Sequence, residues 1–199
     1  MESQIGQSCP ICGVDDSLKM LAHTSEIPYF GEHTQITMSC QSCGWKVTDF
    51  IPAEGKKAGS WKLEVSSEEH ISSRVVRSSS CTVRIVDLGL EVTPGSSSTG
   101  YISNVEGVLD RFSSAIGTIR RQAAAEADED MLRKCDELLS KIDMVMNGHL
   151  TVTLELLDPI GHSQILHDEA VSSEISDEDA KELDPGPVYP VFDVSSEQS

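Results

Sequence analysis

The sequence has few basic residues: 15 Lys and Arg stand against 33 Asp and Glu, which gives a formal net charge of -18. A field of this sign repels phosphates, so it argues against a general nucleic-acid-binding or anionic-membrane-binding protein and leaves a basic or neutral protein partner open. Aromatic residues make up only 5% of the chain, so the core must be mostly aliphatic. The apolar share of 38% is still enough to build a core, which argues against wholesale disorder.

Long hydrophobic runs are also missing. No stretch approaches the ~20 apolar residues that a membrane span requires. The first residues have no basic region followed by an apolar one, so we expect no signal peptide. These absences predict a cytoplasmic protein, in which thiols stay reduced. The six cysteines therefore need an explanation other than disulfides.

Four cysteines form two copies of one motif, Cys-x-x-Cys-Gly, at residues 9–13 and 40–44. The spacing lets two thiolates point at one ion, and the glycine supplies the positive φ that closes the turn. Two such motifs complete the tetrahedral sulfur shell that soft ligands offer to zinc. We therefore predict one zinc ion bound by Cys9, Cys12, Cys40 and Cys43, with an iron centre or chance cysteines as the alternatives.

Four protein ligands leave no open position for water or substrate, so the metal should be structural and not catalytic. Its removal should unfold at least residues 8–50, because a module of this size has little core of its own. The two remaining cysteines differ from these four. Cys81 lies beside a short alternating run and Cys135 lies on an apolar helix face, which favours small buried hydrophobes over reactive thiols.

The pattern along the chain predicts a mainly β protein with one helical segment. We expect strands at 17–27, 34–40 and 45–50, a linker or hairpin turn at 52–59, further strands at 60–66, 82–93 and 150–157, and a flexible loop at 95–100. The predicted domains are a zinc ribbon at 1–51, a β domain at 52–167, and an acidic, proline-containing C-terminal tail at 168–199 that is partly solvated.

Residues 103–147 are predicted to be helical. Ser103 and Glu106 have the spacing of a capping box, in which Ser103 is the N-cap. Apolar residues then recur at helical spacing in two stripes, and Asn147-Gly148 ends the second one. The stripes consist of Val105, Leu109, Phe112, Ile116 and Ile119, and of Met131, Leu132, Cys135, Leu138, Leu139, Ile142 and Met146. An antiparallel two-helix hairpin is predicted; one continuous helix is the alternative, because residues 123–127 contain no helix breaker.

Several of these segments together carry a family resemblance. The paired cysteine motifs, the Ile-Pro-Tyr-Phe run at 27–30, Cys43-Gly44-Trp45, and residues 74–85, 105–109 and 157–161 resemble the ZPR-type zinc-finger proteins, in order from about residue 8 to 167. Three features depart from the family: Cys81 replaces a usual alanine, Ser103-Asn104 replaces a threonine pair, and there is one unit where eukaryotic members carry two. A single unit resembles the archaeal members.

The resemblance implies a four-cysteine zinc ribbon followed by a double-stranded β-helix-like barrel with a helical hairpin insertion. It also implies a non-enzymatic protein that binds translation elongation factor 1-alpha and assists its folding. An enzyme is not expected from the residues either. The six histidines form no cupin-like metal cluster, and the chain has neither a Gly-x-Ser-x-Gly elbow nor a phosphate-binding Gly-rich loop.

Ile27, Pro28, Tyr29 and Phe30 are the predicted partner-binding residues. The run is apolar, Pro28 stiffens it, and Tyr29 or Phe30 has the character of an exposed interface anchor. The alternative is that these side chains pack the ribbon against the barrel.

A zinc ribbon associated with nucleic acid or with the transcription and translation machinery is the alternative function. Phosphate contacts need cations, and residues 1–50 contain only Lys19 and Lys46 against six acidic residues, namely Glu2, Asp15, Asp16, Glu26, Glu32 and Asp49. Direct nucleic-acid binding is therefore disfavoured.

Overall fold

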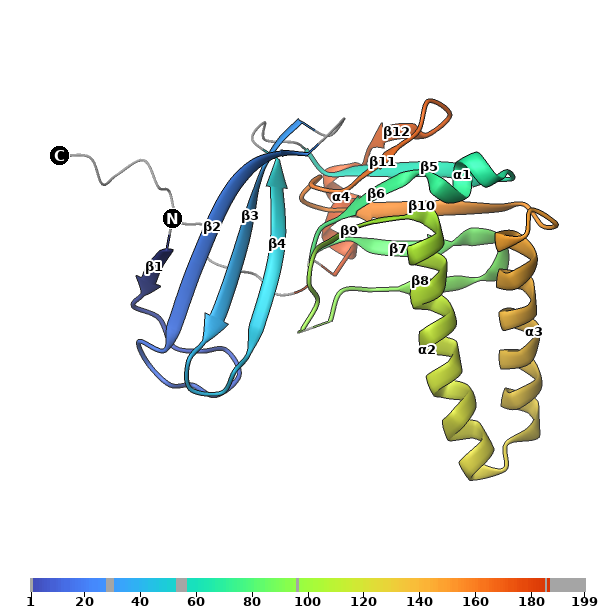
Figure 1. Cartoon of the computed structure of the whole chain (residues 1–199), viewed down its shortest axis with the longest axis horizontal. Helices are drawn as coiled ribbons and strands as arrows, with labels where there is room; N and C mark the ends of the chain where they lie inside the picture. Colours follow the sequence, from blue (N-terminus) through green and yellow to red (C-terminus); the bar gives the residue numbers. More distant parts are fainter. Residues whose placement is uncertain (1, 28–30, 53–56, 96, 185, 187–199) are drawn as a thin grey trace.

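The computed structural model describes residues 2–27, 31–52, 57–95, 97–184 and 186 (Figure 1). Its N-terminal part is a four-stranded antiparallel sheet, which we call the ribbon. The strands follow one another in the order β1 (Glu2–Ile5), β2 (Leu18–Ile27), β3 (Gly31–Cys40) and β4 (Lys46–Pro52). The three predicted ribbon strands are confirmed, and β1 is added at the edge. The ribbon core is small: Ile5, Leu18, Met38 and Val47 pack with two of the cysteines.

The second part consists of two antiparallel sheets, and we call it the barrel. One sheet has five strands in the order β12-β5-β10-β7-β8, and the other has three in the order β11-β6-β9. Their bounds are β5 Gly59–Val65, β6 Arg74–Arg77, β7 Thr82–Ile85, β8 Leu90–Val92, β9 Tyr101–Asn104, β10 Val152–Asp158, β11 Gln164–Leu166 and β12 Val171–Glu174. Fully buried aliphatic side chains from both sheets, such as Leu154 and Val75, meet in one core.

The strand predicted at 150–157, after the helices, is confirmed. β10 pairs with β5 on one side and with β7 on the other, so it lies at the centre of the larger sheet. The predicted strand 82–93 is interrupted, because the 3-10 turn η1 (Val86–Leu88) and Gly89 at φ 61 fold it into the hairpin of β7 and β8.

The predicted boundary at residue 167 is too early. β12 pairs with β5 over residues 171–174, and the helix α4 (Asp177–Glu182) follows it. Every residue of β12 is exposed, so its sequence has no alternation that could identify a strand. Its backbone hydrogen bonds to β5 place it in the sheet. The fold class predicted above, mainly β with a helical hairpin insertion, is confirmed.

The hairpin consists of α2 (Val105–Glu126) and α3 (Glu129–Met146), which run side by side and project away from the strands (Figure 1). Its base completes the barrel core with side chains such as Leu109 and Ile142. Toward the tip the predicted stripes become exposed, with Ile119 at 48% and Met131 at 38%. The short helix α1 (Glu68–Ser72) precedes β6. Among the described residues, no helix is both long and apolar enough to cross a membrane.

The start of α2 differs from the prediction. Asn104 is the N-cap, and its side chain accepts a hydrogen bond from the Gly107 N–H at 2.9 Å. Strand β9 continues through Ser103, which pairs with Val75 of β6, and through Asn104, so the helix begins only at Val105 and the residue before it is the cap. The cap is therefore shifted by one residue through a strand pairing that local sequence does not reveal.

Two residues, Ala127 and Asp128, separate the two helices. Ala127 adopts the left-handed conformation, with φ 55, and Asp128 then caps α3 through its side chain. We predict that Ala127→Gly stabilises the hairpin by up to about 1 kcal/mol, because glycine has no Cβ to strain this conformation. Native-state hydrogen exchange of the α2 and α3 amides measures the effect. The control Ala124→Gly, at an exposed position inside α2, should lower protection by about 1 kcal/mol. Reduced protection in Ala127→Gly would contradict this prediction.

Candidate metal centre

The four predicted ligands come together at the end of the ribbon that lies farthest from the barrel (Figure 1). All four Sγ atoms lie within 4.8 Å of one another. The Cys9 and Cys43 sulfurs are 3.8 Å apart, and the Cys12 and Cys40 sulfurs are 3.7 Å apart. A tetrahedron with metal–sulfur bonds of ~2.3 Å has sulfur–sulfur edges of about 3.8 Å. The site therefore has the dimensions of a four-thiolate metal shell.

Each cysteine pair is carried by the same backbone turn. In the first, the Gly13 N–H donates to the Cys9 carbonyl at 2.8 Å; in the second, the Gly44 N–H donates to the Cys40 carbonyl at 3.0 Å. Both glycines have the predicted positive φ, at 69° and 75°. Amides also point at the sulfurs, since the Ile11 N–H lies 3.4 Å from Cys9 Sγ. Such donors offset the negative charge that four thiolates bring.

The pKa values of two of the thiols, Cys40 and Cys43, shift in opposite directions. The pKa of Cys40 is lowered to about 6 by its contact with Ser17, together with hydrogen bonds from the Cys43 and Ser42 amides. Although a hydrogen bond donated by the Trp45 backbone N–H lowers the pKa of Cys43, burial and the neighbouring sulfurs raise it to about 12. Closely spaced thiolates repel one another, so four of them in one shell require a metal cation to compensate their charge.

The structure corrects the predicted role of Ile27. Ile27 is only 8% exposed and packs in a small cluster with Val76 of β6, to which Phe50 and Leu166 add. It therefore joins the ribbon to the barrel instead of offering an exposed contact. Ile27 and the cysteine shell lie at opposite ends of the ten-residue strand β2, which is about 30 Å long. Pro28, Tyr29 and Phe30 lie outside the described residues.

Cys81 and Cys135 are buried, as predicted, with exposures of 0% and 3%. Burial raises the pKa of the Cys81 thiol to about 12, so this sulfur stays protonated at neutral pH. Neither residue belongs to the four-cysteine group.

A buried polar cluster beside β10 was not predicted. Asp158 is 2% exposed and accepts hydrogen bonds from the hydroxyls of Ser78 (2.7 Å), Ser80 (2.8 Å) and Ser163 (2.7 Å), and from the Ile160 N–H (3.0 Å). We call Ser78, Ser80, Asp158 and Ser163 the serine–aspartate cluster. Burial alone would raise the pKa of Asp158, but these donors outweigh it and lower the pKa below its usual range.

A signal for this cluster is present in the sequence. Ser78-Ser79-Ser80 and Asp158 fall within residues 74–85 and 157–161, two of the segments that carry the family resemblance. Three consecutive serines next to a strand suggest only a loop, because nothing local indicates that a carboxylate about 80 residues away accepts hydrogen bonds from Ser78 and Ser80. The acceptor becomes identifiable only in the folded chain.

A histidine pair near α1 does not have the geometry of a second metal site. His70 Nδ1 accepts the Ser66 N–H at 3.1 Å, and His167 Nδ1 accepts the Glu169 N–H at 3.1 Å. In a neutral imidazole the other nitrogen, Nε2, must then carry the proton, and it has no lone pair for a metal. The His70 Nε2 instead lies 3.3 Å from a Glu169 carboxylate oxygen.

The structure thus defines a two-part protein, in which a four-cysteine ribbon with the geometry of a structural metal site is attached to a barrel with a helical hairpin. A family model described as the ZPR1 jelly-roll domain matches residues 69–182. The chain belongs to the ZPR1 family. The match extends past residue 167, in agreement with the pairing of β12 to the barrel.

Archaeal and eukaryotic relatives agree with this assignment. The chain is 35% identical to an uncharacterized ZPR1-like protein of Pyrococcus horikoshii, over 90% of this chain and 80% of that protein. It is also 35% identical to an uncharacterized ZPR1-like protein of Methanocaldococcus jannaschii, over 94% of this chain and 92% of that one. The zinc finger chaperone zpr1 of Schizosaccharomyces pombe is 25% identical over 79% of this chain, which spans only 34% of the yeast protein.

Proposed function

We propose that this chain is a non-enzymatic cytoplasmic protein that holds one zinc ion and binds translation elongation factor 1-alpha, assisting its folding. The observation that carries the proposal is the shell of four thiols, which is complete without a substrate or water. Such a metal supplies rigidity and no chemistry. All-sulfur tetrahedral sites select zinc or iron, and the two Cys-x-x-Cys-Gly turns favour zinc.

The relatives and the charge support a protein partner. A fission yeast relative is named a zinc finger chaperone, which is a protein-directed activity. The net charge of -18 favours encounter with a basic partner, because opposite fields accelerate association at low salt. The choice of elongation factor 1-alpha rests on the family resemblance described above.

Two projecting ends of the molecule expose apolar side chains that a partner could cover. Ile11 (55% exposed) and Val14 (43%) lie on the first cysteine turn, and Ile119 and Met131 lie toward the hairpin tip. In the view of Figure 1 both ends point away from the barrel on the same side. Exposed aliphatic groups at such positions are candidates for the apolar centre of an interface.

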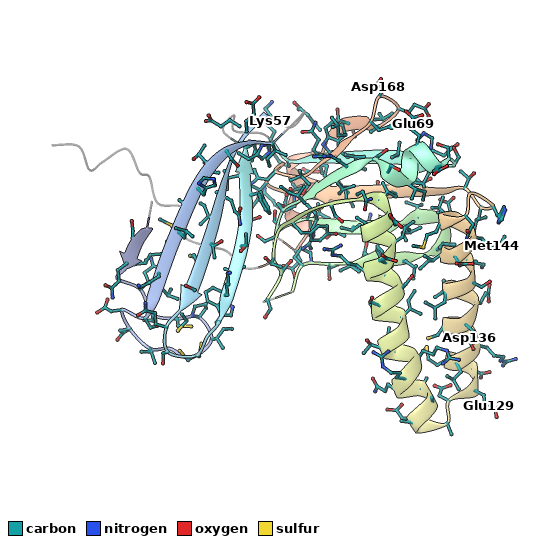
Figure 2. All side chains as sticks on the ribbon, in the orientation of Figure 1. Lys57, Glu69, Glu129, Asp136, Met144 and Asp168 are labelled. Atoms are coloured by element: carbon teal, nitrogen blue, oxygen red, sulfur yellow. The ribbon has the colours of Figure 1, made fainter. Side chains whose placement is uncertain are left out.

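A pull-down of the host elongation factor, in nucleotide-free and GDP-loaded forms at low salt, tests the proposal. We expect the wild-type chain to bind and Ile119→Glu to weaken binding at least about tenfold, because a charge would be buried in the interface. The matched control is Met144→Glu, at a residue of similar exposure (41%) at the barrel end of α3 (Figure 2). Tyr29→Ala tests the anchor predicted from the sequence.

Absence of wild-type binding in both nucleotide states would refute the proposed function. If Ile119→Glu binds as well as Met144→Glu does, only the hairpin contact is rejected. A low-salt gel shift on RNA and DNA gives the alternative its own test: a salt-sensitive retarded band would support a nucleic-acid-associated ribbon.

A further inference from the structure

One carboxylate of the ribbon contacts the barrel through both of its oxygens. Asp49 of β4 accepts the Ser79 N–H at its Oδ1 atom (2.9 Å) and the Ser79 hydroxyl at its Oδ2 atom (2.5 Å). Both oxygens are therefore used by a single residue of the turn between β6 and β7. Hydrogen bonds to an ionised acceptor are about twice as strong as neutral ones, and two of them to one residue also fix orientation.

The residue next to Asp49 makes a second set of contacts. The Thr48 carbonyl accepts the Gly100 N–H at 2.7 Å and the Thr99 hydroxyl at 2.8 Å, and the Thr48 N–H donates to Thr99 Oγ1 at 3.1 Å. The loop at 95–100, predicted to be flexible, thus ends in a docked segment. A Cβ atom on Gly100 would lie 2.7 Å from Asp49 Oδ1 and 3.2 Å from Asp49 Cα. The ribbon can approach this closely only because residue 100 is glycine.

The barrel holds both contact segments in place from within. The serine–aspartate cluster fixes the two serines on either side of Ser79. Arg77, only 6% exposed, donates through Nη2 to the Cys81 carbonyl at 2.7 Å and through Nη1 to the Thr99 carbonyl at 3.1 Å. A buried guanidinium with several fixed acceptors has little freedom to move. The turn and the loop are therefore tied to the barrel by residues of the barrel itself.

An apolar contact adjoins the polar one. Ile27 and Phe50 of the ribbon pack on Val76 and Leu166, which lie on neighbouring strands of the smaller barrel sheet. Burial of these side chains stabilises the contact between ribbon and barrel, but it does not fix their relative orientation, because the hydrophobic effect is non-directional. The hydrogen bonds of Asp49 and Thr48 then select one orientation of the ribbon on the barrel.

We propose that Asp49 is a positioning residue that locks the ribbon to the barrel as one rigid body. The metal-binding end and the hairpin are then held at a fixed separation, so that a single partner contacts both without ordering the two parts first. Asp49 itself touches no partner. The rigid-body statement stands alone, whereas the statement about a partner rests on the function proposed above.

Residual dipolar couplings of the zinc-loaded chain test the rigid-body statement. We expect one alignment tensor to fit the amides of ribbon and barrel in the wild type, and two different tensors in Asp49→Ala. Asp49→Asn should restore one tensor, because its amide oxygen still accepts the Ser79 N–H and the Ser79 hydroxyl can rotate to accept. Glu32→Ala, an exposed ribbon carboxylate on β3, is the control and should keep one tensor. Gly100→Ala should separate the tensors by displacing Asp49.

Amide shifts around the cysteines must be unchanged in Asp49→Ala and Gly100→Ala, so that loss of the ribbon fold is not mistaken for loss of docking. Two tensors in the wild type would overturn the rigid-body statement, and one tensor in both variants would overturn the positioning role of Asp49. In the pull-down, Asp49→Ala should bind the elongation factor at least about tenfold more weakly than Glu32→Ala. Equal binding with separated tensors would reject only the statement about the partner, and failure of the wild type to bind would reject only the proposed function.

Discussion

Replacing Cys40 by serine is expected to abolish metal binding and to unfold the ribbon while the barrel stays folded. Cys40 is 3% exposed, and its sulfur receives the amides of Ser42 and Cys43 at 3.3 and 3.5 Å. Structural zinc contributes roughly 10–16 kcal/mol to such modules. The core of a module this small supplies only about 3–5 kcal/mol, so the apo ribbon should not persist.

Metal content and amide spectra measure this outcome. The wild type should contain one zinc per chain and Cys40→Ser essentially none, with collapsed amide dispersion confined to residues 2–52. Cys135→Ser is the matched control: this cysteine is buried in the barrel core, so the variant should be less stable but should keep its zinc. Full zinc occupancy in Cys40→Ser would disprove the ligand assignment, and iron in the wild type would disprove the choice of metal.

Replacing Asp158 by alanine should destabilise the barrel by about 4 kcal/mol or more. Three serine hydroxyls and one backbone N–H would lose a charged acceptor in a site that water does not reach. Because domains are stable by only about 5–15 kcal/mol, the loss is a large part of the total. Urea unfolding followed through the fluorescence of Trp61, which packs against the barrel core, measures it. The exposed Asp168→Ala (Figure 2) should change stability by less than about 0.5 kcal/mol.

The effect of Asp158 should depend on pH in one direction. Its pKa is lowered in the folded state, so the carboxylate contributes stability that is fully present above the unfolded pKa of about 3.9. That contribution is lost as the pH falls through the folded pKa. The stability difference between wild type and Asp158→Asn should therefore be constant from about pH 5 to 8 and shrink in strong acid. A stability difference between wild type and Asp158→Asn that grows on acidification would contradict the structure. A free energy of unfolding lowered by less than about 1 kcal/mol in Asp158→Asn at pH 7 would contradict it too.

Features set by nearest neighbours in the chain were predictable from the sequence. Each Cys-x-x-Cys-Gly turn is closed by its own amides and glycine, so its form follows from five residues. The alternation at 150–157 identified the central strand, because a strand buried against a core must place apolar residues at every second position. The helical stripes likewise identified α2 and α3. Turns, strands and helices of this kind depend on residue spacing and on the periodicity of apolar residues, and both can be read from the sequence.

Features that depend on distant partners were decided by the tertiary structure. The N-cap moved from Ser103 to Asn104 because β9 pairs with β6, and Ile27 was buried because the ribbon rests on the barrel. The choice between one helix and two depended on Ala127, a residue that only the closing of the hairpin forces into a left-handed conformation. Asp49 and Asp158 look like any other acids among 33 in the sequence. They became identifiable when folding brought serine donors to them, because the free energy of a buried carboxylate depends on its surroundings and not on its neighbours in the chain.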